Sequence, residues 1–390
     1  MANTAIFHSI NRIVQGRGSI ASLPEEVRRL GGTRVLVVTD AGLVQTGIPQ
    51  RVLDLLAGMP AEIYSEVEAE PSAESTDACA RRAAEGGFDL IVGLGGGSPI
   101  DTAKCAAMLV ANGGKAEDYL GIDKVPKPGL PKIFIPTTAG TGSEVTNVAV
   151  LSLKAQQTKK GIVSRHLMAD AAILDAELTA GLPPAVTAAT GMDALTHAIE
   201  AYVSRFAQPL TDYFALEAIR RLGRSLRTAV HYGANLDARE DVLTASLYAG
   251  LAFGSAATGM VHGLAMPLGG LHNVPHGIAN AVLLPHVMKF NLVAALPRFG
   301  DIARALGENV DGLSPRAAAE RAVAAVRSLA EDIGIPPGMA GLGIPRTSME
   351  ALARDGMTNS RQVLPNPRAV TYDGLIGILE DAFADDGGRS

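Results

Sequence analysis

The local pattern of the chain changes abruptly at Leu182-Pro183-Pro184, and this change constrains the fold more than any other feature of the sequence. Before it, short runs rich in Val and Ile alternate with Ala-rich stretches, which predicts a parallel sheet covered by helices on both faces. After it, the β-branched runs disappear and long Ala- and Leu-rich windows predict helices alone. We therefore predict an α/β domain over 1–182 and an all-α domain over 183–390.

Each predicted strand is a buried apolar run that ends near Gly, Pro or Asp. The predicted strands of the first half are 34–39, 61–64, 89–93, 132–136 and 171–175, and its predicted helices are 43–56, 75–86 and 100–110. The predicted helices of the second half are 185–206, 210–230, 238–258, 276–292, 315–333 and 371–383.

Composition excludes several classes of function. The chain has 34 Lys and Arg against 40 Asp and Glu, a net charge of −6, so we expect no nucleic-acid partner. Trp is absent and aromatic residues are 4%, which argues against a base-stacking platform. Two cysteines, Cys79 and Cys105, cannot build a disulfide framework and are predicted to be buried thiols. The N-terminus lacks the pattern of a signal peptide, so we expect a cytoplasmic location.

The segment from Val242 to Met288 contains no charged residue, which raises the question of a membrane span. A span needs about 20 mostly apolar residues. This segment is dense in Gly, Ala and Ser, is interrupted by Pro267, Pro275 and Pro285, and carries four histidines. We therefore predict buried core around a polar site, and no membrane association.

Two turns rich in Gly and hydroxyl residues follow predicted strands of the first half. The run GGGSPID, residues 95–101, opens a predicted helix, where glycines let the backbone approach a phosphate and free N–H groups attract its charge. The run PTTAGTGSE, residues 136–144, ends another strand. Either turn alone is also compatible with an ordinary tight turn. Together, at the carboxyl ends of neighbouring strands, they predict a dinucleotide site.

Asp40 ends the first predicted strand of the α/β half. A carboxylate at this position can accept hydrogen bonds from an adenosine ribose and would repel a 2′-phosphate, which favours NAD over NADP. Asp is also a good N-cap for the helix that follows. Both roles remain open, and they can coexist.

The second half carries a candidate metal site. Asp193 and His197 are four residues apart, so a helix places them on one face. His262 and His276 each precede a glycine. One carboxylate and three imidazoles suit Fe(II), Zn(II) or a related divalent ion and exclude a thiolate site. A single His is more often a hydrogen-bonded core residue, but the joint occurrence of these elements favours a metal site.

Four ordered motifs carry a family resemblance: GGGSPIDTAK, PTTAGTGSEVT, GMDALTHAIEAY and VHGLAMPLGGLHNVPHGIANAVLLPH. Over nearly its whole length the chain resembles the iron-containing (group III) alcohol dehydrogenases, which include lactaldehyde reductase and 1,3-propanediol dehydrogenase. The resemblance implies the dehydroquinate synthase-like fold, with a Rossmann-like N-terminal domain, an all-α C-terminal domain and an active site in the cleft between them. It also implies NAD and Fe(II) or Zn(II) as cofactors, a small alcohol or aldehyde as substrate, and a homodimer or larger homo-oligomer.

The resemblance assigns roles to individual residues. The implied metal ligands are Asp193, His197, His262 and His276. The implied cofactor-binding residues are Asp40, Gly96, Gly97, Ser98, Thr137, Thr138, Thr141, Lys159 near the nicotinamide ribose, and the apolar contact Leu178. The implied substrate-pocket residues are Asn147 and Phe253.

Two positions depart from the family pattern. Many relatives have a second His four residues after the first C-terminal ligand, where this chain has Met266, and a thioether cannot relay a proton. His272 is then the candidate for a catalytic relay, with an ordinary core role as the alternative. Glu70 stands where several relatives carry Asn near the adenine.

The predicted reaction is hydride transfer between a small alcohol and NAD, assisted by a metal that lowers the pKa of the hydroxyl group. A hydroxyacid–oxoacid transhydrogenase is the main alternative, and it needs a basic residue such as Lys159, Arg165 or Lys289 to hold a carboxylate. A dehydroquinate-synthase-like lyase would need an Arg/Lys cluster beside the ligands. A non-catalytic metal protein would not bind NAD.

Overall fold

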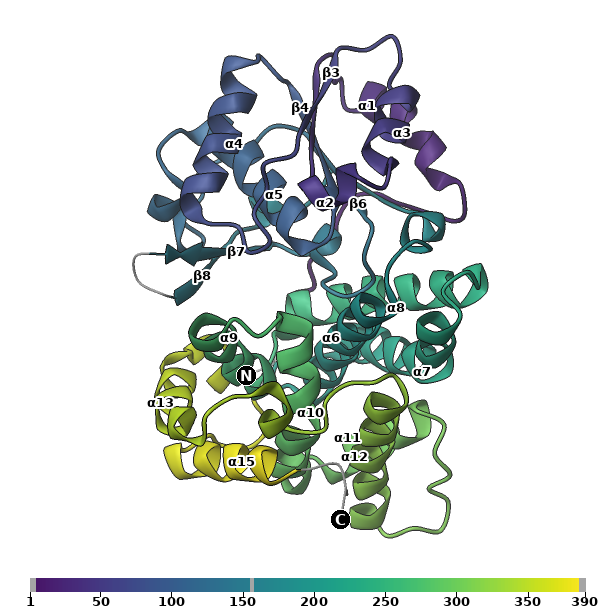
Figure 1. Cartoon of the computed structure of the whole chain (residues 1–390), viewed down its shortest axis with the longest axis vertical. Coiled ribbons are helices and arrows are strands. Elements are labelled where there is room, and N and C mark those ends of the chain that lie inside the picture. The colour runs from purple at the N-terminus through teal and green to yellow at the C-terminus, as the bar shows by residue number, and fades with distance from the viewer. Residues whose placement is uncertain (1–4, 155–157, 386–390) are drawn as a thin grey trace. The chain divides into compact units, whose positions relative to one another are not determined.

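The computed structural model describes residues 5–154 and 158–385. They form two compact units, one of residues 8–181 and the other of residues 5–7 and 182–385. The first unit is α/β and the second is helical, which confirms the predicted fold class (Figure 1).

A six-stranded parallel sheet, in the order β1-β9-β6-β4-β2-β3, is the centre of the α/β unit. Every residue of β2, β4, β6 and β9 is buried, as expected for strands covered on both faces. The strands are β1 (Ile13–Gln15), β2 (Val35–Val38), β3 (Ala61–Tyr64), β4 (Leu90–Gly95), β6 (Lys132–Pro136) and β9 (Ala171–Leu174).

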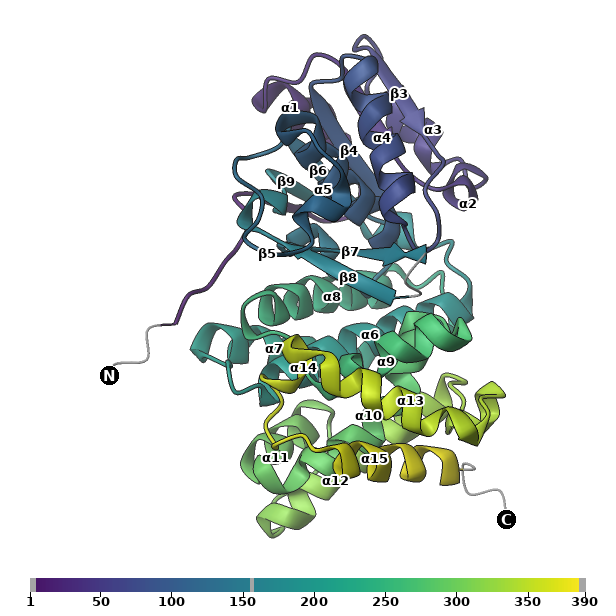
Figure 2. The ribbon, with the colours of Figure 1, turned by 90° about the vertical axis from the view of Figure 1, so that its left-hand side faces the viewer.

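Helices cover both faces of this sheet (Figures 1 and 2). On one face, Val37 belongs to a buried cluster that includes Val27 and Val52 of two helices. On the other face, Gly93 lies so close to a helix that a Cβ there would come within 2.9 Å of the Cβ of Ala103. The helices of this unit are α1 (Leu23–Arg29), α2 (Ala41–Val44), α3 (Ile48–Leu55), α4 (Ala73–Glu85) and α5 (Gly97–Asn112).

The single helix predicted over 43–56 is wrong, because α2 and α3 are separate helices. Gly47 between them has a φ of 78°, in the left-handed region, and this conformation ends one helix and starts the next. Pro49 then stands in the first turn of α3, a position that proline favours.

The α/β unit also contains strands that the sequence patterns did not predict. The edge strand β1 has only three residues. A second, three-stranded sheet has the order β5-β8-β7, with β7 and β8 antiparallel. Its strands are β5 (Gly121–Ile122), β7 (Val148–Leu153) and β8 (Thr158–Val163). The run VAVLSL of β7, rich in Val and Leu, is the sequence signal that could have identified this strand.

The described residues from 182 to 385 contain no strand, and all six predicted helices are present. The helices that correspond to predictions are α6 (Pro184–Val203), α7 (Pro209–His231), α8 (Leu236–Ala256), α10 (His276–Asn291), α12 (Pro315–Asp332) and α15 (Tyr372–Ala384). The additional ones are α9 (Met260–His272), α11 (Leu296–Ala305), α13 (Met349–Thr358) and α14 (Ser360–Val363).

The prolines of the uncharged segment interrupt it less than expected. Only Pro275 lies at a break, where it precedes α10, whereas Pro267 and Pro285 lie inside α9 and α10. A proline inside a helix removes one backbone hydrogen bond and is unfavourable by about 3 kcal/mol. Tertiary packing compensates here, because both helices bury large apolar side chains such as Leu268 and Leu284.

The same segment is packed inside the helical unit. Residues His276–Ala294 are long and apolar enough to cross a membrane, but 67% of an 18-residue stretch of them is buried inside the protein. Helices α8 and α9 are long and apolar enough only when taken together, and they are bent by 102°. Because α10 packs on α6, α9 and α15, the buried-core interpretation of this segment fits the structure.

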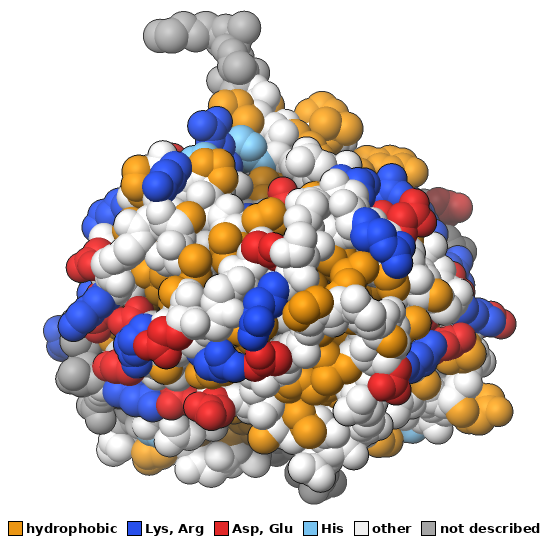
Figure 3. Space-filling view, turned by 90° about the horizontal axis from the view of Figure 1, so that it is seen from above, with side chains coloured by type: hydrophobic (Ala, Val, Ile, Leu, Met, Phe, Trp, Pro, Cys, Tyr) orange, Lys and Arg blue, Asp and Glu red, His pale blue; other side chains and the backbone are white. Residues whose placement is uncertain are grey.

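Charged side chains of both signs are mixed on the face of the molecule seen in Figure 3. Charges of opposite sign also pair with each other in the α/β unit, where Arg34 and Arg82 both form ion pairs with Glu62. Among the described residues on the face in Figure 3, no extended basic strip is visible that could follow a nucleic-acid backbone.

Candidate functional site

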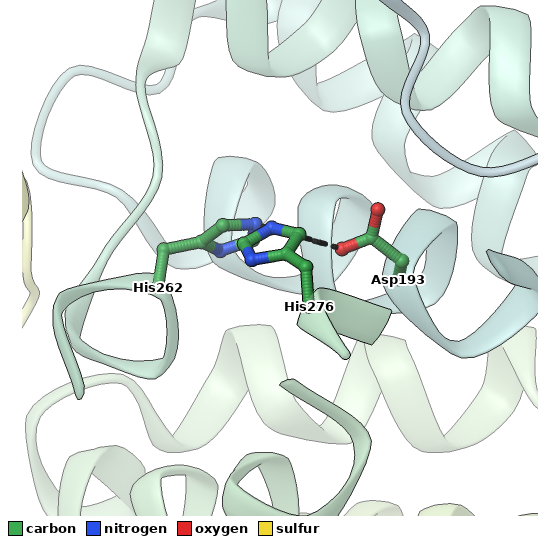
Figure 4. A group of neighbouring side chains, drawn as sticks. All are labelled: Asp193, His262 and His276. Atoms are coloured by element: carbon green, nitrogen blue, oxygen red, sulfur yellow. Dashed lines mark ion pairs between the residues drawn. The ribbon is translucent and has the colours of Figure 1, made fainter. Parts of the chain in front are cut away.

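Three helices of the helical unit bring predicted metal ligands together (Figure 4). Asp193 and His197 lie one turn apart on α6, His262 lies in the first turn of α9, and His276 is the first residue of α10. Asp193 Oδ1 is 3.8 Å from His262 Nε2 and 3.6 Å from His276 Nε2. One ligand atom from each of these three residues lies within 4.8 Å of the others, so one metal ion can bind all three.

His197 adjoins this group. Its Nε2 atom is 3.0 Å from His262 Nε2, and its Nδ1 atom is 3.9 Å from Asp193 Oδ2. The ring stacks on Phe253 of α8, with centroids 4.2 Å apart and an interplanar angle of 15°. The predicted ligand and the predicted pocket residue therefore contact each other. The phenyl ring restricts rotation of the imidazole and keeps water from one of its faces.

Glu200, which the sequence analysis missed, lies beside His262. It is buried on α6, and its Oε2 atom is 2.6 Å from His262 Nδ1. Its Oε1 atom accepts a hydrogen bond of 2.7 Å from the Val261 N–H at the start of α9. Because an ionised carboxylate only accepts, His262 Nδ1 carries the hydrogen and Nε2 presents its lone pair to the cluster. The position of Glu200 three residues after His197 is the signal that could have identified it.

Electrostatics favours a positive charge at this place. Burial by itself lowers the pKa of His262, but the negative charges of Glu200 and Asp193 outweigh burial, so that the pKa is raised. A cation at the cluster, whether a proton or a metal ion, is stabilised by these two carboxylates.

Asn280 is a second residue that the sequence analysis missed. Its fully buried amide nitrogen lies 2.7 Å from Asp193 Oδ1, 3.1 Å from His276 Nε2 and 3.2 Å from His262 Nε2. The amide donates to Asp193 Oδ1 and lies within hydrogen-bond distance of both imidazole nitrogens, so the same small volume is bordered by the carboxylate and the two rings. This donor set of carboxylate oxygen and imidazole nitrogen fits Fe(II) or Zn(II). Asn280 lies four residues after His276 on α10, the spacing that could have identified it.

The two predicted cofactor turns of the α/β unit lie against each other. Strands β4 and β6 are neighbours in the sheet, and the turns follow their carboxyl ends. A Cβ on Gly97 would come 3.0 Å from Thr141 Cγ2, and one on Gly96 would come 3.3 Å from Thr138 Oγ1. Gly95 has a φ of 146°, which a residue with a side chain rarely adopts. The glycines are therefore needed for this contact.

The start of α5 is suited to an anion. Its N-cap, Gly96, provides no side-chain hydrogen bond, so the helix offers backbone N–H groups of its first turn to a ligand. Beside it, the N–H of the buried Thr137 donates to the carbonyl of Gly95 over 2.9 Å, which fixes the second turn to the end of β4.

The helix-capping role proposed for Asp40 is confirmed. Its Oδ1 atom accepts a hydrogen bond of 2.9 Å from the N–H of Leu43, at the start of α2. The ribose contact stays a prediction. The two roles remain compatible, because a carboxylate can accept further hydrogen bonds.

Three further positions singled out in the sequence meet at one segment. Ser98 donates to the carbonyl of Ala69, and Lys159 of β8 forms an ion pair with Glu70. The segment around Glu70 is thus attached both to the glycine turn at the start of α5 and to β8. The carboxylate of Glu70 holds the ammonium group of Lys159.

The remaining predicted site residues lie apart from these groups or at their edge. Leu178 is buried in the hydrophobic core of the α/β unit, and Asn147 is half-buried just before β7. Met266 contacts the amide of Asn359, with 3.4 Å between Sδ and Nδ2. His272 ends α9 and lies outside the group of converging ligand atoms, and its buried Nε2 atom has no hydrogen-bond partner among the described residues.

Comparison with known proteins identifies the family. The family described as iron-containing alcohol dehydrogenase matches residues 11–176, and the family described as Fe-containing alcohol dehydrogenase, C-terminal, matches residues 187–383. The chain belongs to the iron-containing alcohol dehydrogenases. It is therefore an oxidoreductase that acts on CH–OH groups.

Individual members of this iron-containing family are similar over almost the full chain. Long-chain-alcohol dehydrogenase 1 of Geobacillus thermodenitrificans is 45% identical over 95% of this chain and 94% of its own length. The crystal structure of a 1,3-propanediol oxidoreductase matches with a TM-score of 0.96 and 41% identity, covering 98% of this chain and 100% of that one. The sulfoacetaldehyde reductase of Bifidobacterium kashiwanohense, solved in complex with NAD+, matches with a TM-score of 0.89 and 32% identity over 98% and 99% of the two chains.

Proposed function

We propose that this protein is an NAD-dependent and divalent-metal-dependent dehydrogenase that interconverts a small alcohol and its aldehyde. The observation that carries the proposal is the convergence of Asp193, His262 and His276 from three helices on one point. Buried charges in proteins are paired or coordinate metals, and the buried carboxylate of Asp193 lies beside two imidazole nitrogens.

The residues of the cluster and their neighbours have different roles in the proposed reaction. When bound, the metal supplies Lewis acidity that lowers the pKa of the substrate hydroxyl, and NAD supplies the hydride acceptor. Asp193 balances part of the positive charge, and Glu200 holds His262 in the tautomer that a ligand needs. Phe253 restricts His197 and helps to exclude water.

The features of the α/β unit support NAD as the cofactor. The glycine turn at the start of α5 suits a pyrophosphate, and Asp40 at the end of β2 disfavours a 2′-phosphate. The related sulfoacetaldehyde reductase was solved with NAD+. By the same proposal Thr138, Thr141 and Lys159 contact the cofactor.

We further propose that His272 relays the proton that leaves the alcohol, since Met266 cannot. The buried Nε2 atom without a described partner supports this role. In His272→Gln we expect kcat to fall about tenfold. Metal content and the Kd for NADH should not change. An unchanged kcat would exclude the relay.

The deciding experiment follows NADH and NADPH oxidation by metal-free protein that has been reloaded with Fe(II) or with Zn(II). The carbonyl substrates should be C2–C4 aldehydes, lactaldehyde, hydroxyaldehydes and 2-oxo acids. Long-chain aldehydes belong in the panel because a relative is named for long-chain alcohols. We expect metal-dependent turnover of NADH with neutral aldehydes, and loss of that turnover in Asp193→Ala.

The other outcomes are equally informative. Hydride exchange between a hydroxy acid and an oxo acid without turnover of free NADH would replace the proposal by the transhydrogenase. Turnover that is the same with and without metal would contradict the role given to the cluster. Equal turnover with NADPH would contradict the role given to Asp40.

A further inference from the structure

Lys104 is a completely buried lysine in the α/β unit. It lies on α5, two helical turns after Gly96 and Gly97. Its Nζ atom donates to Val148 O over 2.6 Å, to Ser143 Oγ over 2.7 Å and to Thr146 Oγ1 over 3.2 Å. An ammonium group has three N–H donors, so all three are used.

Asp101 completes this network from one turn earlier on the same helix. One of its carboxylate oxygens accepts a hydrogen bond of 2.6 Å from Ser143 Oγ and lies 3.5 Å from Lys104 Nζ. The other oxygen accepts a hydrogen bond of 2.9 Å from the Val150 N–H in β7. Ser143 therefore donates to the carboxylate and accepts from the ammonium group. Each donor in this network faces an acceptor.

The three hydrogen-bond acceptors of Lys104 belong to the segment between β6 and β7 or to the first residue of β7. This segment, residues 137–147, contains Thr138 and Thr141, the two residues that touch Gly96 and Gly97. One end of α5 thus contacts the segment through glycines, and the helix interior holds it through Lys104 and Asp101. We call this network of Lys104, Asp101 and Ser143 the brace. It connects the two turns that are expected to receive the cofactor.

The burial of this charge needs an explanation beyond ordinary stability. Burial lowers the pKa of Lys104 below its usual value, and the nearby negative charges of Asp101 and Glu144 oppose this only in part. Replacing a buried ion pair by apolar residues is often neutral or stabilising, so such a pair is weak evidence of a role in stability alone. A charge that directs three bonds to one segment instead specifies the conformation of that segment.

We propose that Lys104 is a positioning residue for the dinucleotide: it holds residues 137–147 in the conformation that receives the cofactor. This inference rests on the proposed function, because it assumes that these turns bind NAD. Lys104 acts through Ser143 and Thr146 and not by touching the cofactor. Its loss should therefore weaken cofactor binding and leave the metal cluster unchanged.

Lys132 offers a matched control. It is also a buried lysine of the α/β unit, but its Nζ atom lies 3.5 Å from Leu130 O and 3.8 Å from Asp170, near the amino end of β6. Lys104→Met and Lys132→Met each remove one buried ammonium group from the same unit. Only the first removes the brace.

The test measures the Kd for NADH by fluorescence titration, together with Tm and metal content, for wild type and both variants. The titration is done at least 15 °C below the lower Tm. We expect Lys104→Met to raise the Kd by about tenfold or more, because all three hydrogen bonds from the ammonium group to the segment are lost. Lys132→Met should change it less than twofold. Metal content should be equal in all three proteins.

Two further variants keep the proposal testable if Lys104→Met does not fold. Ser143→Ala and Asp101→Asn each remove one part of the network and should raise the Kd about threefold. An unchanged Kd with a lowered Tm in the Lys104 and Ser143 variants would overturn the proposal, as would equal effects of the Lys104 and Lys132 variants. Absence of NADH and NADPH binding by the wild-type protein would instead refute the proposed function itself.

Discussion

The metal cluster and the cofactor turns are built in contrasting ways. In the helical unit, the chemistry depends on a few large polar side chains, and three helices each contribute at least one of them. In the α/β unit, backbone groups and small residues at two neighbouring strand ends form the proposed cofactor site. The first arrangement selects a cation through its donor atoms, and the second selects an anion through free N–H groups.

The two regions nevertheless share one device. Each has a buried charged residue that supports the predicted ligands, directly or through a neighbouring segment, without being one of them. Glu200 holds His262 and the start of α9, and Lys104 holds the segment that contains Thr141. The signs are opposite, because the anion supports a cation site and the cation supports a segment next to an anion site. Charges are buried in both places because each is fully hydrogen-bonded.

The largest expected effect separates the two regions. His262→Ala removes a metal ligand, so we expect loss of bound metal and a decrease in kcat of about a thousandfold or more. The Kd for NADH, measured on metal-free protein, should stay within twofold of wild type. Metal analysis and fluorescence titration check both. Retention of a full complement of metal would show that the cluster is not the metal site.

A smaller effect is expected when only the supporting carboxylate of the metal region changes. Glu200→Gln retains the shape but loses the charge and one acceptor, so we expect zinc affinity to fall about 10–100-fold. Competition with a chromophoric chelator measures this without activity. Glu350→Gln, at an exposed ion pair on α13, is the control and should have no effect. Equal zinc affinity of wild type and Glu200→Gln would show that Glu200 does not support the metal cluster in the way that Lys104 is proposed to support the cofactor segment.

The cofactor region should respond to a single methyl group. In Gly97→Ala the new Cβ would lie 3.0 Å from Thr141 Cγ2, so the two turns must move apart. We expect the KM for NADH to rise about fivefold to tenfold, a cost of about 1 kcal/mol for overpacking. Zinc affinity should not change. Gly377→Ala, on α15 with no atom within 4 Å of the added Cβ, is the control.

The smallest effect is expected at Asn280. Asn280→Ala removes one neutral hydrogen-bond donor to Asp193, which contributes about 1 kcal/mol, so zinc affinity should fall about fivefold. Chelator competition on this variant next to Glu200→Gln ranks the two supports. An effect of Asn280→Ala larger than that of Glu200→Gln would mean that the amide, and not the carboxylate, is the main support of the cluster.

Several features of the site could be predicted because they are local. A helix places residues i and i+4 on one face, which was enough to pair Asp193 with His197. A glycine run after a buried strand was enough to place Gly96 and Gly97 at the start of a helix. Asp40 at a strand end was enough to predict an N-cap, which the structure confirms.

Other features could not be predicted because they depend on distant partners. Nothing near Lys104 in the sequence indicates that Ser143 and Thr146, 39 and 42 residues away, would accept hydrogen bonds from its ammonium group. Nothing near Pro267 and Pro285 indicates that packing would keep their helices intact. The split of the 43–56 region was readable, since Gly47 and Pro49 are local signals, and the prediction failed by giving them too little weight.

The sequence by itself determined the α/β and helical halves, the position of the two turns and the residues that supply metal-binding chemistry, because period, turn composition and donor type are properties of short segments. Only the tertiary structure decided that α6, α9 and α10 direct their donors to one point, and that buried charges brace both regions. These contacts join residues far apart in the chain. Their geometry follows from how whole helices and strands pack, which no local pattern records.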